Sequence, residues 1–246
     1  MLNGLQKTQM DALQLLSNER AHHALSYRSI AQLEHYAQLL RFAIPKLTEA
    51  MSVEEKSAFA EGMEFIPHTI EQGQKESADG FRSVIRRTTI VLSDIIENLV
   101  EATIGTCLLH LDPEIATIRH VTKFKRQALN ERLLRQAVRA WESDLFIKLP
   151  RRTDRFSKML ASFFPSFIEP DGFDFLNELM QARNEFSHEL ITVQDHPSPL
   201  LGASWTLSSI DQAFDVANDF LLAIMKAVPG DYEGPVPVFG LDLPTL

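Results

Sequence analysis

The stretch 171-DGFDFLNELMQARNEFSHEL-190 has the apolar spacing of one amphipathic helix. At about 100° per residue, its apolar side chains gather on one side of the helix. These residues are Phe175, Leu179, Ala182, Phe186 and Leu190, with Leu176 and Met180 at the edge. Arg183 projects into the same stripe, and burying a guanidinium without a partner is costly because it stays charged. We therefore expect an anionic partner for Arg183, either a carboxylate of another helix or a phosphate.

Asn184 and His188 lie four residues apart on the adjoining face of this helix. A phosphate-binding cation, an amide that can orient a ring and a histidine that titrates near neutral pH form a suitable set for metal-free RNA cleavage. On residue types alone, an ordinary surface histidine beside a helix–helix ion pair is the more common explanation.

The order Arg183, Asn184 and then His188, near the end of a helix, resembles the signature of the HEPN superfamily (higher eukaryotes and prokaryotes nucleotide-binding). Many members of that superfamily are metal-independent endoribonucleases of toxin–antitoxin, abortive-infection and CRISPR systems. The resemblance implies an all-α antiparallel helical bundle that cleaves single-stranded RNA, with Arg183, Asn184 and His188 as catalytic residues. A looser match, Arg28 to His35, lacks the Asn after the Arg, and we interpret it as a decoy.

In HEPN proteins an early core helix often carries an acidic residue that is thought to interact with the Arg of the motif. Residues 81–111 are the most strongly periodic part of the chain and predict such a helix. The resemblance makes Glu101 the candidate acid and adds it to the catalytic set. Asp94 and Glu97 share its face, and a solvated acidic face without a catalytic role is the alternative.

Composition describes an ordinary globular protein, since 45% of the 246 residues are hydrophobic and Gly is sparse. No apolar run is long enough to cross a bilayer, and the N-terminal residues lack the pattern of a secretory signal. The single cysteine, Cys107, cannot form an internal disulfide and is expected in the core. These features predict a cytoplasmic protein with no membrane contact.

The net charge of −9 conceals a basic zone at residues 119–158, which holds 12 of the 24 basic residues and only four acids. A basic zone on an acidic protein is typical of a phosphate-binding surface. The expected RNA-binding residues are Arg132, Arg135, Arg139, Arg151 and Arg152. The alternative, which we weigh equally, is a helix face that pairs with acidic helices of the same or another subunit.

The expected domains are an N-terminal helical extension at 1–80, a HEPN-like bundle at 81–228 and a Pro-rich extended tail at 229–246. Within the extension, one helix over 5–41 is expected to end before Pro45, and a second is expected to begin at Ser52 with a capping box to Glu55. The polar residues 71–80 are expected to form a loop or a weak helix end. In the bundle, we expect a short helix over 151–164 and a final helix capped by Ser208 or Ser209. The remaining histidines of interest are expected at the surface, namely His22, His23 and the loop residue His196.

No phosphate-binding loop, nucleophile elbow or zinc-spaced Cys/His array occurs, so neither a metal nor an organic cofactor is expected. The resemblance predicts a homodimer, because HEPN sites are commonly built where two units meet and this chain has one motif. RNA and an antitoxin or regulatory protein are the expected partners. Two rival hypotheses remain open: a non-catalytic helical module that binds RNA, a nucleotide or a protein, and an all-α scaffold without a site.

Overall fold

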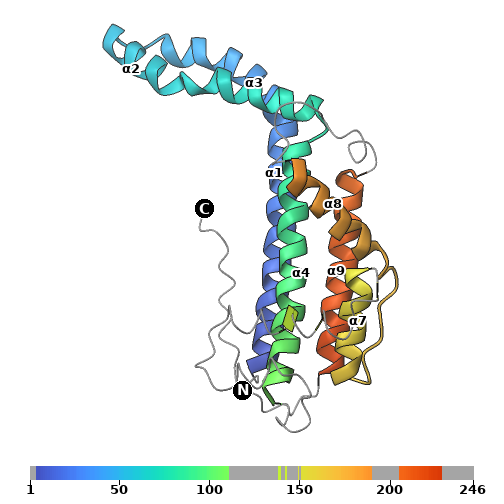
Figure 1. Ribbon diagram of the computed structural model, residues 1–246. Coiled ribbons are helices and arrows are strands. Elements are labelled where there is room, and N and C mark those ends of the chain that lie inside the picture. The colour runs from blue at the N-terminus through green and yellow to red at the C-terminus, as the bar shows by residue number, and fades with distance from the viewer. Residues whose placement is uncertain are drawn as a thin grey trace. The chain divides into compact units, whose positions relative to one another are not determined.

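The computed structural model describes residues 4–110, 138, 139, 142, 149, 151–189 and 205–228. Every regular element in this part of the chain is an α-helix (Figure 1). The helices are α1 (Gly4–Thr48), α2 (Val53–Met63), α3 (Phe65–Ala78), α4 (Arg82–His110), α7 (Arg152–Phe163), α8 (Phe175–Glu189) and α9 (Leu207–Ala227). The prediction of an all-α protein is therefore confirmed for the described residues, whereas the tail after Pro229 and most of the basic zone lie outside them.

By its internal contacts the chain divides into two units. The first joins residues 1–19 to the chain from Thr89 onward, and the second is Arg20–Thr88. Both α1 and α4 contribute to each unit, so this division differs from the expected boundary after residue 80.

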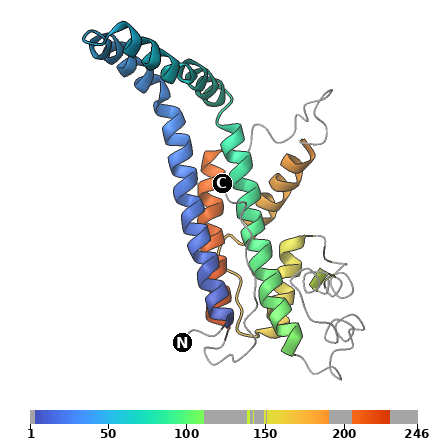
Figure 2. The same ribbon diagram turned by 90° about the vertical axis from the view of Figure 1, so that its left-hand side faces the viewer.

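The first unit is built around α4, α8 and α9, with α7 packed against α8 (Figure 2). Phe220 of α9 contacts the rings of Phe167 and Phe173, which belong to the segment between α7 and α8. Trp205 reaches back from the start of α9 to donate a hydrogen bond to Thr89 Oγ1 of α4 (2.9 Å). The largest fully buried side chains of this core are Leu92, Ile96, Ile104, Phe156, Met159, Leu160, Leu176, Leu179, Phe214 and Phe220.

Helix ends in the first unit follow local capping rules. The expected helix over 151–164 is present as α7, and the motif helix α8 follows a turn at residues 171–174 in which Gly172 has a φ of 74°. The cap of α9 is Thr206 rather than Ser208 or Ser209. Thr206 and Ser209 form a capping box, in which Thr206 is the N-cap and Ser209 is the third residue of the helix.

In the second unit, α1 continues through Pro45 to Thr48, and the expected break at that proline is wrong. Pro45 lies in the last turn of the helix, so the backbone hydrogen bond that it cannot donate is lost near the end of α1 and not in its middle. Thr48 Oγ1 donates to the carbonyl oxygens of Ile44 (2.9 Å) and Pro45 (3.2 Å), which satisfies part of that frayed end. The capping box of Ser52 and Glu55 at the start of α2 is confirmed.

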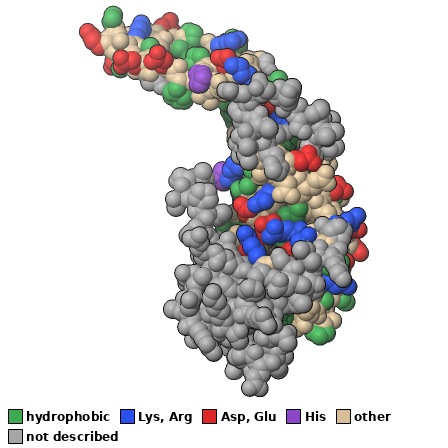
Figure 3. Space-filling view, viewed as in Figure 1, with side chains coloured by type: hydrophobic (Ala, Val, Ile, Leu, Met, Phe, Trp, Pro, Cys, Tyr) green, Lys and Arg blue, Asp and Glu red, His purple; other side chains and the backbone are tan. Residues whose placement is uncertain are grey.

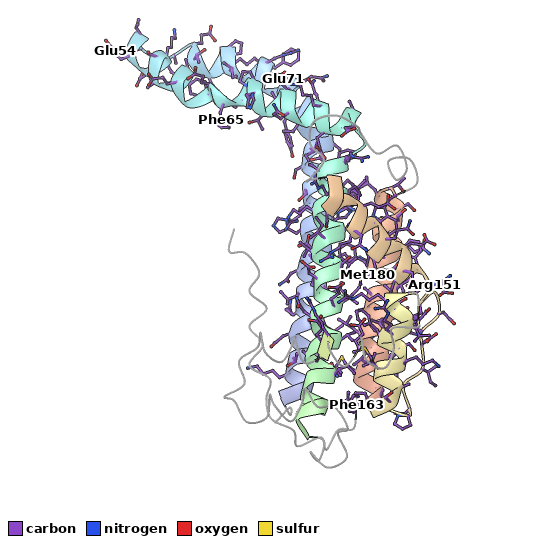
Figure 4. The ribbon with its side chains drawn as sticks, in the orientation of Figure 1. Glu54, Phe65, Glu71, Arg151, Phe163 and Met180 are labelled. Atoms are coloured by element: carbon purple, nitrogen blue, oxygen red, sulfur yellow. The ribbon has the colours of Figure 1, made fainter. Side chains whose placement is uncertain are left out.

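The segment 71–80, expected as a loop or a weak helix end, is helical as far as Ala78. A Cβ added to Gly73 would lie 2.0 Å from Leu33 Cδ1, so the missing side chain lets α3 pack closely on α1. Glu71, labelled in Figure 4, forms an exposed ion pair with Lys75 at 2.8 Å. Gly73 is therefore a packing position within α3 and does not end the helix.

A tight turn with positive φ at Gly80 (67°) and Phe81 (63°) joins α3 to α4. A phenylalanine is rare in this conformation. Glu76 supports the turn, because its Oε1 accepts hydrogen bonds from the backbone N–H groups of Ser83 (2.7 Å) and Val84 (3.2 Å) at the start of α4. The ring of Phe81 packs edge-on against Tyr27 of α1.

His23 was expected at the surface, but it is only 1% exposed. Its Nδ1 lies 3.0 Å from Thr88 Oγ1 of α4, so a hydrogen bond accompanies the burial. The neighbouring His22 is exposed, as expected. Burial of one histidine of the pair and not the other follows from the 100° rotation between adjacent helix positions.

Candidate nucleic-acid interface

Three acidic residues of α4, Asp94, Glu97 and Glu101, share one face of the helix because they are three and four positions apart. We call them the carboxylate row. Glu97 is only 7% exposed and Glu101 only 3%, so the expectation of a solvated acidic face is wrong for these two residues. Charged groups are buried at this level when they are paired, and the partners of the row are arginines.

Each carboxylate of the row meets a guanidinium from another part of the first unit. Arg183 Nη2 of α8 donates to Asp94 Oδ1 (3.4 Å), and Arg139 Nε donates to Glu101 Oε1 (2.9 Å). Arg152 of α7 lies between them, 3.3 Å from Glu97 Oε1 and 3.5 Å from Glu101 Oε1. We call Arg139, Arg152 and Arg183 the arginine row. In Figure 3, basic and acidic side chains intermix over this part of the molecule.

Arg183 has the anionic partner that its place in the motif helix predicts, but the partner is Asp94 and not Glu101. Asp94 lies two turns nearer the start of α4, and Glu101 is engaged by Arg139 and Arg152 instead. Arg183 Nη1 also donates to Asn184 Oδ1 (3.4 Å), so the first two residues of the motif contact each other. The Arg183 side chain is 32% exposed and therefore borders the core without being enclosed by it.

His188 belongs to the last turn of α8, and its side chain is outside the described residues. Directly before it, Ser187 Oγ donates to the carbonyl oxygen of Arg183, one turn earlier in α8 (2.8 Å). Of the apolar stripe predicted for α8, Leu179, Ala182 and Phe186 are buried, and so are Leu176 and Met180, which were expected at its edge. Phe175 is only half-buried, and Leu190 lies outside the described residues. This burial fixes the rotation of α8 about its axis, and with it the direction from which Arg183 approaches α4.

The arginines of the basic zone fall into different environments. Arg139 is 58% exposed and Arg152 34% exposed, and both contact Glu101. The guanidinium of Arg152 also lies 5.4 Å from the ring centre of Phe156. Arg151, labelled in Figure 4, starts α7 and pairs with the exposed Asp174 at 3.0 Å. Arg132 and Arg135 lie outside the described residues.

For the described arginines, the structure shows pairing with acidic residues, and phosphate binding by the basic zone stays a prediction. Arg152 and Arg155 pair with buried acids, Arg155 with Glu142 at 3.3 Å. Arg139 keeps most of its side chain in solvent while one buried carboxylate holds it. Residue spacing within a helix identified the carboxylate row but could not show which arginines it meets, because those come from elements far apart in the sequence.

Burial raises the pKa of Glu97, and the nearby charges of Glu101 and Asp94 act in the same direction. The guanidinium groups of Arg152 and Arg183 oppose the shift but do not cancel it. Conversely, the hydrogen bond and the charge of Glu101 raise the pKa of Arg139. Burial therefore favours the protonated form of Glu97, whereas Glu101 favours the charged form of Arg139.

A Glu97→Gln variant is expected to weaken the dependence of stability on pH. Since the folded state holds the Glu97 proton at a pH where the unfolded chain has lost it, wild-type stability should fall as pH rises through a window that begins at the ordinary value of 4.5. Gln has no proton to lose, so the unfolding free energy of the variant should decline less across that window. Urea unfolding at a series of pH values measures this, with the exposed Glu178→Gln as control. Parallel pH profiles for wild type and Glu97→Gln would contradict the expectation.

Three buried polar atoms of this region have no partner among the described residues: Glu101 Oε2, Arg183 Nε and Asn177 Nδ2. Arg152 Nε forms no well-aligned hydrogen bond, although it lies 3.3 Å from Glu97 Oε1. Thr153 Oγ1 donates to the amide oxygen of Asn177, so only the nitrogen of that amide is left over. Unpaired polar atoms at such depth are costly unless water or a ligand meets them. The network thus has hydrogen-bonding capacity that its own side chains do not use.

Within the described residues, no group of His, Cys, Asp and Glu side chains is arranged to hold a metal ion. None of the described helices is long and apolar enough to cross a membrane. In comparisons with known proteins, the chain matches no family model, no curated protein and no solved structure. A functional inference for this chain therefore depends on the contacts between the arginine row and the carboxylate row.

Proposed function

We propose that the chain is a metal-independent endoribonuclease of the HEPN type, acting on single-stranded RNA in a defence or toxin–antitoxin system. The observation that carries the proposal is the setting of Arg183. An acid of a long core helix, Asp94, orients its guanidinium, Asn184 contacts it, and His188 follows at the end of the same helix. An acid on an early core helix beside the motif Arg is what the resemblance implies, with Asp94 in place of Glu101.

In this proposal, the 2′-oxygen of a ribose forms a bond to the adjacent phosphorus while the bond from phosphorus to the 5′-oxygen breaks. His188 accepts the proton of the 2′-hydroxyl, and a protonated His188 gives one to the departing 5′-oxygen. Arg183 neutralises the charge that develops on the phosphate oxygens. The products are a cyclic phosphate end and a free 5′-hydroxyl.

One histidine cannot be base and acid in the same step, which is why we propose a homodimer that brings two copies of the motif together. The two His188 side chains then take the two roles across the seam. A toxin of this kind also needs a partner protein that keeps it inactive, and we propose an antitoxin or regulatory protein for that role.

Incubation of the purified chain with single-stranded RNA in EDTA tests the proposal. Wild type should cleave, and His188→Ala should cleave about 10²- to 10⁴-fold more slowly, the usual range for loss of a general acid or base. His35→Ala is the matched control, because His35 is an exposed histidine in the looser Arg28–His35 pattern and should be dispensable. Equal rates for wild type and His188→Ala would remove the nuclease proposal.

A non-catalytic RNA-binding module is the second candidate, and the ion pairs of the arginine row favour it because they suit a structural role for the motif arginine. Each of its three guanidinium groups has an acidic partner within 3.5 Å, as expected of a structural ion-pair network. This candidate predicts RNA binding without turnover, so the same experiment separates the two functions.

A further inference from the structure

The carboxylate row sets the spacing of the arginine row along α4. Asp94 holds Arg183 and Glu101 holds Arg139, and these two acids are seven residues apart. At 1.5 Å per residue, the two anchoring points are about 10 Å apart along the helix axis. Arg152 occupies the interval, in contact with Glu97 and Glu101.

Arg139 is held in a way that leaves its outer edge open to a ligand. Only its Nε hydrogen bond to Glu101 is present among the described residues, so both terminal nitrogens remain for an anion. Because Glu101 is almost fully buried, it anchors the guanidinium without offering its own charge to solvent. A guanidinium oriented in advance loses less freedom when it binds, which favours charge-assisted contacts to phosphate.

Arg183 also has a donor that the network does not use. Its Nη2 donates to Asp94 and its Nη1 to Asn184, but its buried Nε has no hydrogen-bond partner in the described part of the chain. An unpaired donor at such depth is costly unless water or a ligand meets it. Donor capacity is therefore present at the Arg183 end of the row as well as at the exposed Arg139.

We propose that the arginine row binds at least two successive phosphates of one single-stranded RNA, so that the ligand is an oligonucleotide and not a mononucleotide. Asp94 and Glu101, which hold Arg183 and Arg139, are about 10 Å apart along α4, and hydrogen bonds of about 3 Å to the oxygens of a single phosphate do not span that distance. Arg183 contacts the scissile phosphate, and Arg139 contacts a phosphate further along the strand. The assignment of RNA rests on the proposed function, whereas the two-phosphate spacing rests on the geometry of α4.

Binding of a labelled single-stranded RNA oligonucleotide to the full-length His188→Ala protein tests this inference without cleavage. The affinity is measured against salt concentration, with and without Arg139→Gln. Loss of one phosphate contact on a single strand should lower the slope of log affinity against log salt by about 0.7 and weaken binding several-fold. Arg41→Gln, which removes an exposed arginine of α1, is the matched control and should change neither quantity. Adenosine monophosphate should compete at least 100-fold less well than the oligonucleotide.

The outcomes separate this inference from the proposed function. A reduced slope in Arg139→Gln, combined with no cleavage by wild type, supports the phosphate track and removes the nuclease. Cleavage by wild type, combined with an unchanged slope in Arg139→Gln, overturns the phosphate track and leaves the nuclease in place. Tight competition by adenosine monophosphate, or no binding of RNA by the parent protein, also overturns the inference. Circular dichroism of Arg139→Gln shows whether misfolding is the cause of any lost binding. Arg139→Lys, which keeps the charge, is measured in the same way as a second variant.

Discussion

An Arg183→Ala variant is expected to lose RNA cleavage by about 10²- to 10³-fold while remaining folded. The loss follows from removal of the cation that faces the phosphate, because a preorganised donor at a developing negative charge contributes on this scale. Stability should change little, since Arg183 is 32% exposed and Asp94 is 49% exposed, and ion pairs of this kind contribute about 1 kcal/mol or less. Single-turnover cleavage rates and urea unfolding of the same preparations measure the two effects separately.

Two further substitutions refine this prediction. Arg183→Lys keeps the charge but loses the planar fork that contacts both Asp94 and Asn184, so its rate should fall between those of wild type and Arg183→Ala. Asp94→Asn keeps Arg183 and removes only the charge that orients it, so a smaller loss is expected. Wild-type cleavage by Arg183→Ala would show that the guanidinium serves only the ion pair.

A Glu101→Ala variant is expected to destabilise the first unit by about 3 kcal/mol, the low end of the range for removing one partner of a buried ion pair. Glu101 is the most deeply buried acid of the carboxylate row, and two arginines converge on its Oε1. Its removal leaves the half-buried Arg152 with Glu97 alone, a carboxyl whose pKa burial raises. Arg139 is mostly exposed and can turn to solvent, which is why the low end of the range applies.

Urea unfolding of Glu101→Ala measures this loss, with Asp94→Ala as the matched control. Both variants remove an acid of α4 that pairs with an arginine, but Asp94 is half-exposed, so its loss should cost about 1 kcal/mol or less. Glu101→Gln should lie between the two, because it keeps an acceptor for Arg139 and Arg152. Equal destabilisation by Glu101→Ala and Asp94→Ala would show that depth of burial does not govern the network.

Local signals along the chain predicted most of the helices. The apolar spacing of residues 81–111 and of 175–190 predicted α4 and α8, and the Ser52–Glu55 capping box marked the start of α2. The predictions failed where a contact with a distant residue outweighs a local preference. Gly73 stays helical because Leu33 packs against its bare backbone, and His23 is buried because Thr88 offers it a hydrogen bond.

The candidate site was likewise predicted in part from the sequence and decided in part by the tertiary structure. Sequence alone brought Arg183, Asn184 and His188 onto one helix and showed that Arg183 needs an anion, because helical periodicity and the cost of a buried charge are local arguments. It also placed Asp94, Glu97 and Glu101 on one face of another helix. Only the tertiary structure decided that this face is buried, that Asp94 meets Arg183, and that Arg139 and Arg152 converge on Glu101. Those pairings depend on how α4, α7 and α8 pack, and packing is set by contacts between residues that no periodicity within a single helix can relate.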